Sequence, residues 1–300
     1  MRVLVEASGS LTSGYLIRSI QEAGFNVVAS DITEDCFGKY LSDDFIKMPK
    51  IAEESSWEKT LDLVFKNNIQ VVLPSLDETL QEWAKSKEML LQNNIHVIIS
   101  DSNTVEIFID KWKTFLFFEK YGIPTPETSL ESKYPVIKPR RGRGSAGIFI
   151  AKDNEDVNMD GNISQQLIRG TEYTVDVFCD FNNKPVYIVP RKRINVKEGK
   201  STCGIAVKHS EIEKYVRIIC SSIPFIGPIN IQCFEEENGD LKFIEINPRI
   251  AGGMALGFAA TENWISLMSS NLIHYEPINP VEVKYGLKMM RYYNEVFTLE

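Results

Sequence analysis

The segment that says most about the fold reads IKPRRGRGSAGI over residues 137–148. It predicts an apolar strand ending at Lys138, a loop with three glycines and three arginines, and a return into a second strand. Glycines let backbone N–H groups approach phosphate oxygens, and a lysine supplies a point charge at a fixed reach. A Walker loop is excluded because no Gly-Lys-Ser/Thr sequence opens a helix here. An arginine-glycine segment that binds nucleic acid would be disordered, whereas apolar strands bracket this loop, so we expect a phosphate cradle.

A second polar cluster lies in the strand FIEINPR over residues 243–249. Side chains alternate along a strand, so Glu245, Asn247 and Arg249 are expected to project from one face. A carboxylate and an amide oxygen about 7 Å apart suit a Mg²⁺ ion that bridges phosphates, and a neighbouring guanidinium suits transferred negative charge. Gln232, on the partner strand of the expected hairpin, can face the same site. The alternative interpretation is a solvated strand face.

The first hundred residues alternate buried strands with helical segments. Apolar runs at 3–5, 27–29, 71–73 and 97–99 are separated by helical stretches at 16–23, 57–66 and 77–92. This alternation predicts a mostly parallel sheet. The turn from Gly9 to Gly14, with Asp31 at the end of the next strand, invites a dinucleotide-binding interpretation, but its spacing departs from G-x-G-x-x-G and favours a structural turn. A small ligand at this sheet edge stays open. Asp77 and Glu78, at another strand end, are interpreted as favourable acids at a helix N-terminus.

Beyond residue 100 the pattern changes to strands joined by turns. A helix opens at Asp110-Lys111 and closes at Gly122. Strands are then expected at 135–138, 147–150, 164–168, 174–188, 230–235 and 241–246, helices at 211–222 and 261–273, and a last strand near Lys288. Such a succession of strands is typical of antiparallel sheets. The expected fold class is therefore α/β, with a Rossmann-like parallel sheet followed by a mixed α+β region.

Composition limits the functions that the chain can have. A net charge of −8, from 41 acidic and 33 basic residues, argues against a surface built to grip nucleic acid or anionic lipid. No apolar run reaches the roughly 18 residues of a membrane span. The five cysteines include no C-x-x-C pair, and the three histidines lack metal-ligand spacing, which argues against a disulfide framework and a zinc knuckle. We expect a cytoplasmic protein without nucleic-acid or membrane partners.

Four motifs occur in the order and spacing of the ATP-grasp ligases. They are Asp110-Lys111 ahead of a helix that ends in YGIPTP, Lys138 before its glycine-rich loop, QQLIRGTE over 165–172, and EINPR over 245–249. The chain most resembles the branch related to the large subunit of carbamoyl-phosphate synthase and to small amino-acid ligases. The resemblance implies a Rossmann-like pre-ATP-grasp domain at 1–105 and a two-lobed ATP-grasp domain at 106–300, with a small ATP lobe at about 106–168 and a C-terminal lobe at about 169–300.

The resemblance also implies roles for individual residues. ATP would be bound by Lys111 and Lys138 at the phosphates, by a closing loop that includes Gly142, Arg143, Gly144 and Ser145, by Gln165, Gln166, Leu167 and Ile168 at the adenine edge, and by Glu172 at the ribose hydroxyls. Mg²⁺, as one or two ions and with Mn²⁺ as an alternative, would be held by Gln232, Glu245 and Asn247. Arg249 would steady the transferred phosphoryl group, and Arg191 or Arg193 would face the substrate. Residues 140 and 141 would join these cations around the triphosphate.

The reaction implied is ATP-dependent activation of a carboxylate to an acyl phosphate, followed by attack of an amine to give an amide bond. Positioning and charge neutralisation accelerate such transfers, so no serine or cysteine nucleophile is expected. Two alternatives stay open: bicarbonate as the acid, giving carboxyphosphate or carbamoyl phosphate, and an ATP-binding sensor without catalysis. The partners would be a small-molecule acid and amine, and a homodimer stays open. A loop at 251–258 and a polar lid at 195–202 are expected to border the substrate.

Overall fold

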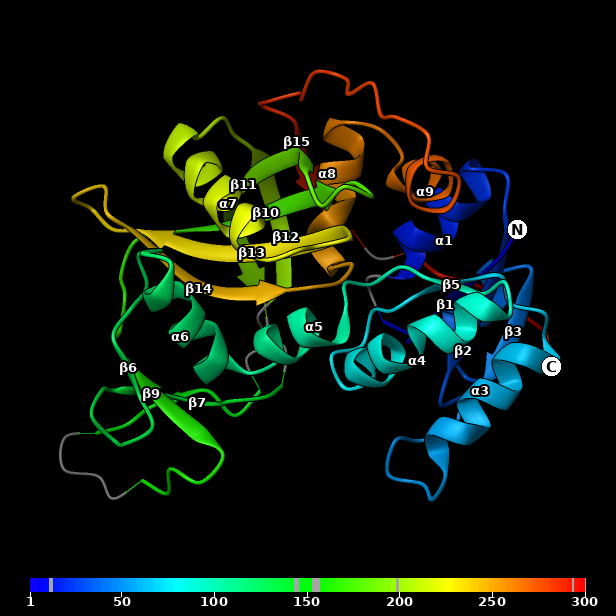
Figure 1. Cartoon of the computed structure of the whole chain (residues 1–300), viewed down its shortest axis with the longest axis horizontal. Helices are drawn as coiled ribbons and strands as arrows, with labels where there is room; N and C mark the ends of the chain where they lie inside the picture. The colour runs from blue at the N-terminus through cyan, green and yellow to red at the C-terminus, as the bar shows by residue number, and fades with distance from the viewer. Residues whose placement is uncertain (11–12, 143–145, 153–156, 198–199, 293, 300) are drawn as a thin grey trace.

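The computed structural model describes residues 1–10, 13–142, 146–152, 157–197, 200–292 and 294–299. Within these ranges the strands form three sheets, which lie in different parts of the molecule (Figure 1). The predicted fold class, a parallel α/β unit followed by antiparallel α+β lobes, is confirmed.

The N-terminal unit is a parallel sheet in the order β3-β2-β1-β4-β5. Its strands are β1 (Arg2–Val5), β2 (Asn26–Asp31), β3 (Asp44–Lys47), β4 (Val71–Leu73) and β5 (His96–Val97), and its helices are α1 (Ser13–Glu22), α2 (Phe37–Leu41), α3 (Ser56–Lys66) and α4 (Leu80–Gln92). β1 and β4 carry unbroken apolar runs because helices cover both faces of the sheet. The carboxylate of Asp31 accepts a hydrogen bond from the backbone N–H of Gly9 at 2.9 Å, so this acid holds the turn after β1.

The small lobe is a four-stranded antiparallel sheet in the order β6-β9-β7-β8. Its elements are α5 (Ser102–Phe108), α6 (Lys111–Lys120), β6 (Thr128–Ser129), β7 (Val136–Pro139), β8 (Phe149–Ile150) and β9 (Asn162–Gln165). α5 was not predicted; it begins at Asp101, whose carboxylate caps the helix by accepting from the N–H of Thr104. The chain then leaves the small lobe through residues 166–169.

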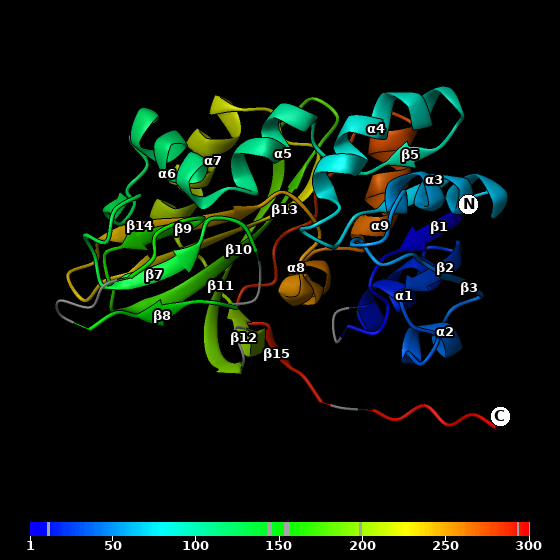
Figure 2. The ribbon, with the colours of Figure 1, turned by 90° about the horizontal axis from the view of Figure 1, so that it is seen from below.

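The large lobe is a six-stranded antiparallel sheet in the order β14-β13-β10-β11-β12-β15. Its strands are β10 (Thr171–Cys179), β11 (Pro185–Lys197), β12 (Lys200–Ala206), β13 (Gly227–Glu235), β14 (Leu241–Asn247) and β15 (Lys288–Met290), and its helices are α7 (Ser210–Ser222), η1 (Gly252–Met254), α8 (Ala255–Ala260), α9 (Trp264–Leu267) and the π-helix η2 (Met268–Ile273). Figure 2 shows α5, α6 and α7 in one layer over this sheet.

Two apolar cores lie on opposite faces of the large sheet. On one face, Phe108 of α5 and Phe118 of α6 pack with Val175 and Ile219. On the other face, Trp264 and Phe178 pack in one cluster with Leu16 and Ile17 of α1, together with residues of β1. The N-terminal unit and the large lobe therefore share a hydrophobic core, which fixes the parallel sheet against the large lobe.

Several predicted boundaries were wrong. The strand predicted at 164–168 ends at Gln165, because its pairing with β6 and with β7 ends there. The helix predicted at 261–273 begins at Trp264, because Asn263 caps α9 by accepting from the N–H of Ile265, and the π-helix η2 then continues the helical run to Ile273. The loop predicted at 251–258 is largely helical, and the lid predicted at 195–202 continues into β11 and β12, with residues 198–199 outside the described ranges.

Among the helices in the described ranges, none combines the length and the apolar character needed to cross a membrane.

Candidate active site

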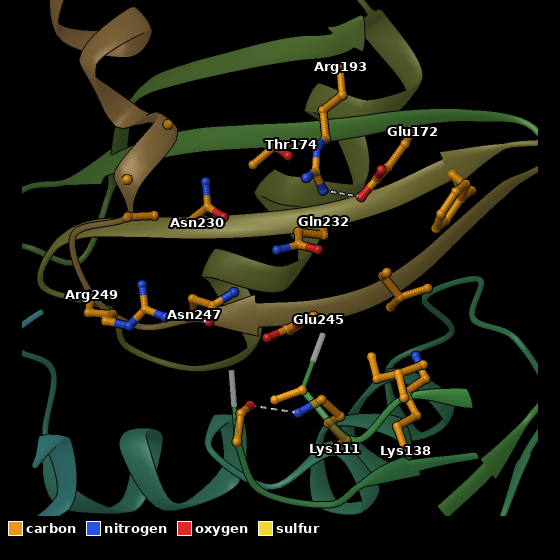
Figure 3. A pocket seen from close by; sticks show the side chains of 18 of the residues that line it. Lys111, Lys138, Glu172, Thr174, Arg193, Asn230, Gln232, Glu245, Asn247 and Arg249 are labelled. Carbon is orange, nitrogen blue, oxygen red and sulfur yellow. Dashed lines mark hydrogen bonds and ion pairs between the residues drawn. The ribbon is translucent and has the colours of Figure 1, made fainter. Parts of the chain in front are cut away.

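A cavity of about 500 Å³ lies where the three bodies meet. The small lobe lines it with β7 and the first residue of α6, the large lobe with β10, β11, β13 and β14, and the N-terminal unit with the loops after β1 and β4. Figure 3 shows Gln232, Glu245 and Asn247 on two adjacent strands, facing Lys111 and Lys138 across the cavity. Charged groups from distant parts of the sequence thus meet in one space.

Lys138 lies near the end of β7 and is only 8% exposed. Burial lowers the pKa of its ammonium group to about 8; the charge of Glu245 opposes this shift, and the charge of Lys111 contributes to it. A buried lysine that has no ion-pair partner within the described residues is suited to bind an anion. The cavity supplies the space for one.

Lys111 is the first residue of α6, and the loop after β7 is held against it. Its ammonium group donates to the carbonyl oxygen of Gly142 at 3.0 Å, and its backbone N–H donates to the carbonyl of Arg140 at 2.9 Å. Gly142 has a φ of 124°, a conformation that glycine adopts without strain. Three residues predicted to continue this loop around the phosphates, Arg143, Gly144 and Ser145, lie outside the described residues.

Two arginines of the loop have carboxylate partners close to α6. Arg140 forms a two-pronged ion pair with Asp110, the closer contact being 2.6 Å, and Arg141 pairs with Glu106 at 3.0 Å. Hydrogen bonds from Arg140 and from the backbone of α6 lower the pKa of Asp110, although burial acts to raise it. Both arginines anchor the loop, which corrects the expectation that they converge on a triphosphate, although Arg141 borders the cavity.

Residues 165–168 form the connection between the lobes and line the cavity. The amide of Gln165 is buried and donates to the hydroxyl of Thr128 at 2.9 Å, while the backbone N–H of Gln166 donates to the carbonyl of Glu127. The backbone groups of Leu167 and Ile168 have no hydrogen-bond partner within the described ranges. A planar heterocycle could therefore pair with that backbone, while Gln165 serves to hold the connection in place.

Glu172 and Arg193 form an ion pair with each other. Glu172 lies on β10 and Arg193 on the adjacent antiparallel strand β11, and the guanidinium donates to the carboxylate. Burial raises the pKa of Glu172, and Arg193 opposes that shift. The sequence assigned these residues to different ligands, the ribose and the substrate, whereas Figure 3 shows their side chains directed toward one another.

The candidate metal ligands come from a strand pair. Gln232 of β13 lies directly opposite Glu245 of β14, and Asn247 lies opposite Asn230. Within the described residues, the side chains of Gln232 and Glu245 have no hydrogen-bond partner, and the Oδ1 atom of Asn247 accepts from Arg249. One carboxylate with amide oxygens fits Mg²⁺, which commonly takes one or two protein carboxylates and completes its shell with water and substrate phosphates. Among the described residues, no group of three or more His, Cys, Asp or Glu side chains could hold a metal ion. Gln232, Glu245 and Asn247 therefore do not resemble a site in which the protein supplies every metal ligand.

Arg191 belongs to a fully buried ion pair beneath the cavity. Its Nε lies 2.6 Å from Oδ2 of Asp176, and its Nη2 donates to Oδ1 of the same residue at 2.8 Å. Burial raises the pKa of Asp176, while Arg191 and a hydrogen bond from Asn230 oppose the shift. The guanidinium also packs on the backbone of Gly253, where a Cβ would lie only 2.7 Å from Nη1. Sequence analysis did not predict a role for Asp176, because its partner Arg191 lies on the next strand and only the strand pairing brings the two together.

Arg249 is also ion-paired, and its partner comes from the N-terminal unit. Nε and Nη2 donate to the two carboxylate oxygens of Asp77 at 2.5 and 2.7 Å. Sequence analysis interpreted Asp77 as an acid at a helix N-terminus, but α4 begins only at Leu80. The side chain of Asp77 instead pairs with Arg249 across the domain boundary. The sequence feature that could have pointed to a role in the site is the position of Asp77 after β4, since ligand crevices form at the carboxyl ends of parallel strands.

Two family models match the chain: the PylC-like N-terminal domain over residues 4–98 and the ATP-grasp domain over residues 108–253. The chain therefore contains an ATP-grasp domain that follows a PylC-like N-terminal domain. It is 26% identical over 190 residues to a carbamoyl-phosphate synthase of Methanobrevibacter smithii, an alignment that covers 57% of this chain and 50% of that protein. The chain thus spans about half the length of this curated relative.

Solved structures share the fold. The N5-carboxyaminoimidazole synthetase of Staphylococcus aureus, complexed with ADP, matches with a TM-score of 0.75 and 18% identity, covering 97% of this chain and 82% of that one. The biotin carboxylase domain of Hydrogenobacter thermophilus 2-oxoglutarate carboxylase, solved with MgADP, ADP and bicarbonate, matches with a TM-score of 0.73 and 16% identity, covering 96% and 73%.

Proposed function

We propose that this chain is an ATP- and Mg²⁺-dependent ligase that joins a carboxylic acid to an amine and releases ADP and phosphate. The observation that carries the proposal is the cavity in which Lys111 and Lys138 face Glu245, Asn247 and Gln232. Lysines suit phosphate oxygens, and the opposing oxygen donors suit the cation that accompanies a nucleotide. The ADP-bound S. aureus synthetase and the MgADP-bound H. thermophilus domain, which share the fold, support a nucleotide in this space.

The proposed reaction has two displacements. A carboxylate oxygen of the acid attacks the γ-phosphorus of ATP, and the bond from that phosphorus to the β–γ bridging oxygen breaks, so ADP leaves with the electron pair. The amine nitrogen then attacks the acyl carbon of the acyl phosphate and loses a proton, and inorganic phosphate leaves. Lys111 and Lys138 would bind the phosphates and Arg249 would face the transferred group, because charge on those oxygens is what the protein must stabilise.

Mg²⁺, when bound by Glu245, Asn247 and Gln232, would neutralise phosphate charge and orient the nucleotide. The remaining roles follow the same proposal. The backbone of residues 166–168 would contact adenine, with Gln165 as its support, and Glu172 would reach the ribose. Arg191 and Arg193 would lie on the side of the substrate acid. The domain bounds proposed are 1–105 for the N-terminal unit, about 106–168 for the small lobe and about 169–300 for the large lobe.

The test is a screen of paired acids and amines with Mg-ATP, with release of ADP as the readout. Lys138→Ala should abolish substrate-dependent ADP release, while Lys133→Ala, which removes an exposed lysine from the same lobe, should leave it unchanged. With an ¹⁸O-labelled acid, label should appear in the released phosphate because the attacking carboxylate oxygen stays with phosphorus. ADP release by Lys138→Ala at the wild-type rate, or unlabelled phosphate, would contradict the proposal.

A second candidate function has bicarbonate as the acid. It is favoured by the similarity to the M. smithii carbamoyl-phosphate synthase and by the bicarbonate bound in the H. thermophilus domain. ADP release that depends on bicarbonate and not on an added carboxylic acid would select it. A nucleotide sensor would instead bind ATP and release no ADP with any acid.

The same proposal covers surroundings and partners. Small-molecule substrates are proposed as the partners, without nucleic acid or membrane, and a homodimer would be tested by light scattering. All five cysteines are buried with free thiols, which supports a reducing, cytoplasmic compartment.

A further inference from the structure

The N-terminal unit contributes its functional sheet edge to the cavity. β1 and β4 are neighbours in the sheet, and the sheet order reverses direction between them, so the loops after these strands border a crevice. Ala7 and Ser10 after β1, and Ser75 after β4, line the same cavity as the lysines of the small lobe. The parallel sheet is thus part of the wall of the site.

The contact that crosses this boundary fixes the guanidinium of Arg249. Nε and Nη2 bind the two oxygens of Asp77, Nη2 also donates to Oδ1 of Asn247 at 3.2 Å, and Nη1 donates to the carbonyl of Ile250 at 3.1 Å. A guanidinium has five N–H groups, so these contacts leave one Nη1 hydrogen without an acceptor in the described part of the chain. Arg249 lines the cavity, and Figure 3 shows its side chain beside Asn247.

Asp77 is itself held by a buried acid. The carboxylate of Glu6, at the end of β1, accepts from the backbone N–H groups of Ser75 and Leu76 at 2.9 and 3.4 Å, just before Asp77. It also accepts from the hydroxyl of Thr79 at 2.9 Å and the indole of Trp83 at 2.8 Å. Glu6 is 6% exposed. The loop that carries Asp77 is therefore fastened to the sheet on both sides of Asp77.

We propose that Asp77 is a positioning residue that holds Arg249 toward the phosphoryl group in transfer, and that Glu6 keeps Asp77 in place. The proposal rests on the proposed function. A bidentate carboxylate fixes the plane of a guanidinium, because two parallel N–H donors must meet two oxygens. The N-terminal unit thereby completes the ATP-grasp site, although both ATP-binding lysines come from the small lobe.

The test measures binding, so it needs no knowledge of the acid or amine. The titrants are MgADP alone and MgADP with aluminium fluoride, which mimics a phosphoryl group in transfer. Asp77→Asn keeps the size of the side chain but loses the charge and one acceptor. We expect it to leave MgADP affinity within about 3-fold and to reduce the gain from aluminium fluoride about 10- to 100-fold, the scale of a misplaced catalytic group. Glu82→Gln on α4, an exposed acid paired with Lys85, is the charge-matched control and should change neither affinity.

A role that runs through Arg249 has a further signature. In an Arg249→Ala background, Asp77→Asn should cause no additional loss, because the group that it positions is gone. Asp77→Glu should restore part of the gain, since the charge returns.

Three results with the variants would overturn the inference. They are an unchanged or increased gain from aluminium fluoride in Asp77→Asn, an equal loss for MgADP alone, and a loss that persists in the Arg249→Ala background. Absence of any gain in the wild type would overturn it as well. Failure of the proposed function would give a different result: no pair of acid and amine would cause ADP release, while the increase in MgADP affinity with aluminium fluoride would still depend on Asp77.

Discussion

Replacing Lys138 by methionine should stabilise the protein while weakening ATP binding. The side chain is 8% exposed on β7, and its burial holds the pKa near 8, below the ordinary 10.5. Each tenfold change in an acid constant corresponds to about 1.4 kcal/mol, so keeping this ammonium charged in the folded state costs about 3 kcal/mol. Methionine has a similar length and no charge to bury, so Lys138→Met removes that cost.

The effect has a defined pH window. Because the pKa of Lys138 is lower in the folded state, the unfolded chain binds more protons between pH 8 and 10.5, and wild-type stability rises through that range. Below pH 8 both states are protonated, and the full penalty is present. The stabilisation by Lys138→Met should therefore be largest, up to about 3 kcal/mol, below pH 8 and should shrink toward pH 10.5.

The assay is urea unfolding at pH 7 and pH 9.5 for the wild type, Lys138→Met and Lys133→Met, the last as a control at an exposed lysine of the same lobe. Binding of MgATP by calorimetry completes it. Loss of a hydrogen bond to a charged group, about 1.5 to 3 kcal/mol, should weaken binding by roughly 10- to 150-fold. Equal stabilities of wild type and Lys138→Met at pH 7, or a difference that does not decline at pH 9.5, would refute the reasoning that Lys138 is kept charged against its burial.

Three further outcomes follow from other contacts. Glu245→Gln should weaken MgADP binding about 10- to 100-fold but affect metal-free ADP much less, as calorimetry with and without a chelator would show; equal effects on both would remove Glu245 from the metal set. Asp176→Asn should lower the free energy of unfolding by about 3–5 kcal/mol in urea, because it leaves the buried Arg191 charge without its counterion; a loss below about 1 kcal/mol would argue against that pair. Gly170→Ala should lower the free energy of unfolding by about 1–3 kcal/mol, because the new Cβ would overlap the carbonyl oxygen of Glu235. Gly14→Ala is the control: its Cβ would meet only Phe37 at 3.9 Å, so it should be neutral or stabilising. Similar melting temperatures for the two variants would contradict the overlap.

The sequence was most informative where a local pattern determines the structure. Unbroken apolar runs at β1 and β4 indicate strands buried on both faces. Alternation along β14 indicated that Glu245 and Asn247 share a face, and both line the cavity, although a register shift in the β13–β14 pair brings Ile244 to it as well. Ends of elements were less predictable, because they depend on partners elsewhere: the strand β9 ends where its neighbours β6 and β7 end. The helix expected from 261 begins instead at Trp264 because Asn263 caps it there, and an amphipathic period does not show where a cap lies.

The ion-pair and hydrogen-bond partners of the charged side chains could not be predicted from local patterns. Asp77 and Arg249 are separated by 172 positions, and Glu6 and Trp83 by 77. Sequence showed the arginines and indicated anion handling, but the register of β10 with β11 and the packing of the parallel sheet decide which carboxylate each one meets. Such contacts are set by tertiary structure, for which periodicity carries no information.

These ion pairs distinguish the arginines of the cavity from its two lysines. Arg191, Arg193 and Arg249 each bind a carboxylate directly, so each guanidinium is oriented and most of its charge is already balanced. Lys111 contacts a carbonyl, and Lys138 has no ion-pair partner within 4 Å in the described residues, although Glu245 acts on it through space. The charge available to a triphosphate therefore comes mainly from two lysines on the small lobe, not from the eight basic residues that sequence alone would gather there. Since Glu245 adds a negative charge on the opposite wall, nucleotide phosphates need a divalent cation between them and that wall, and ATP and Mg²⁺ should bind as a unit.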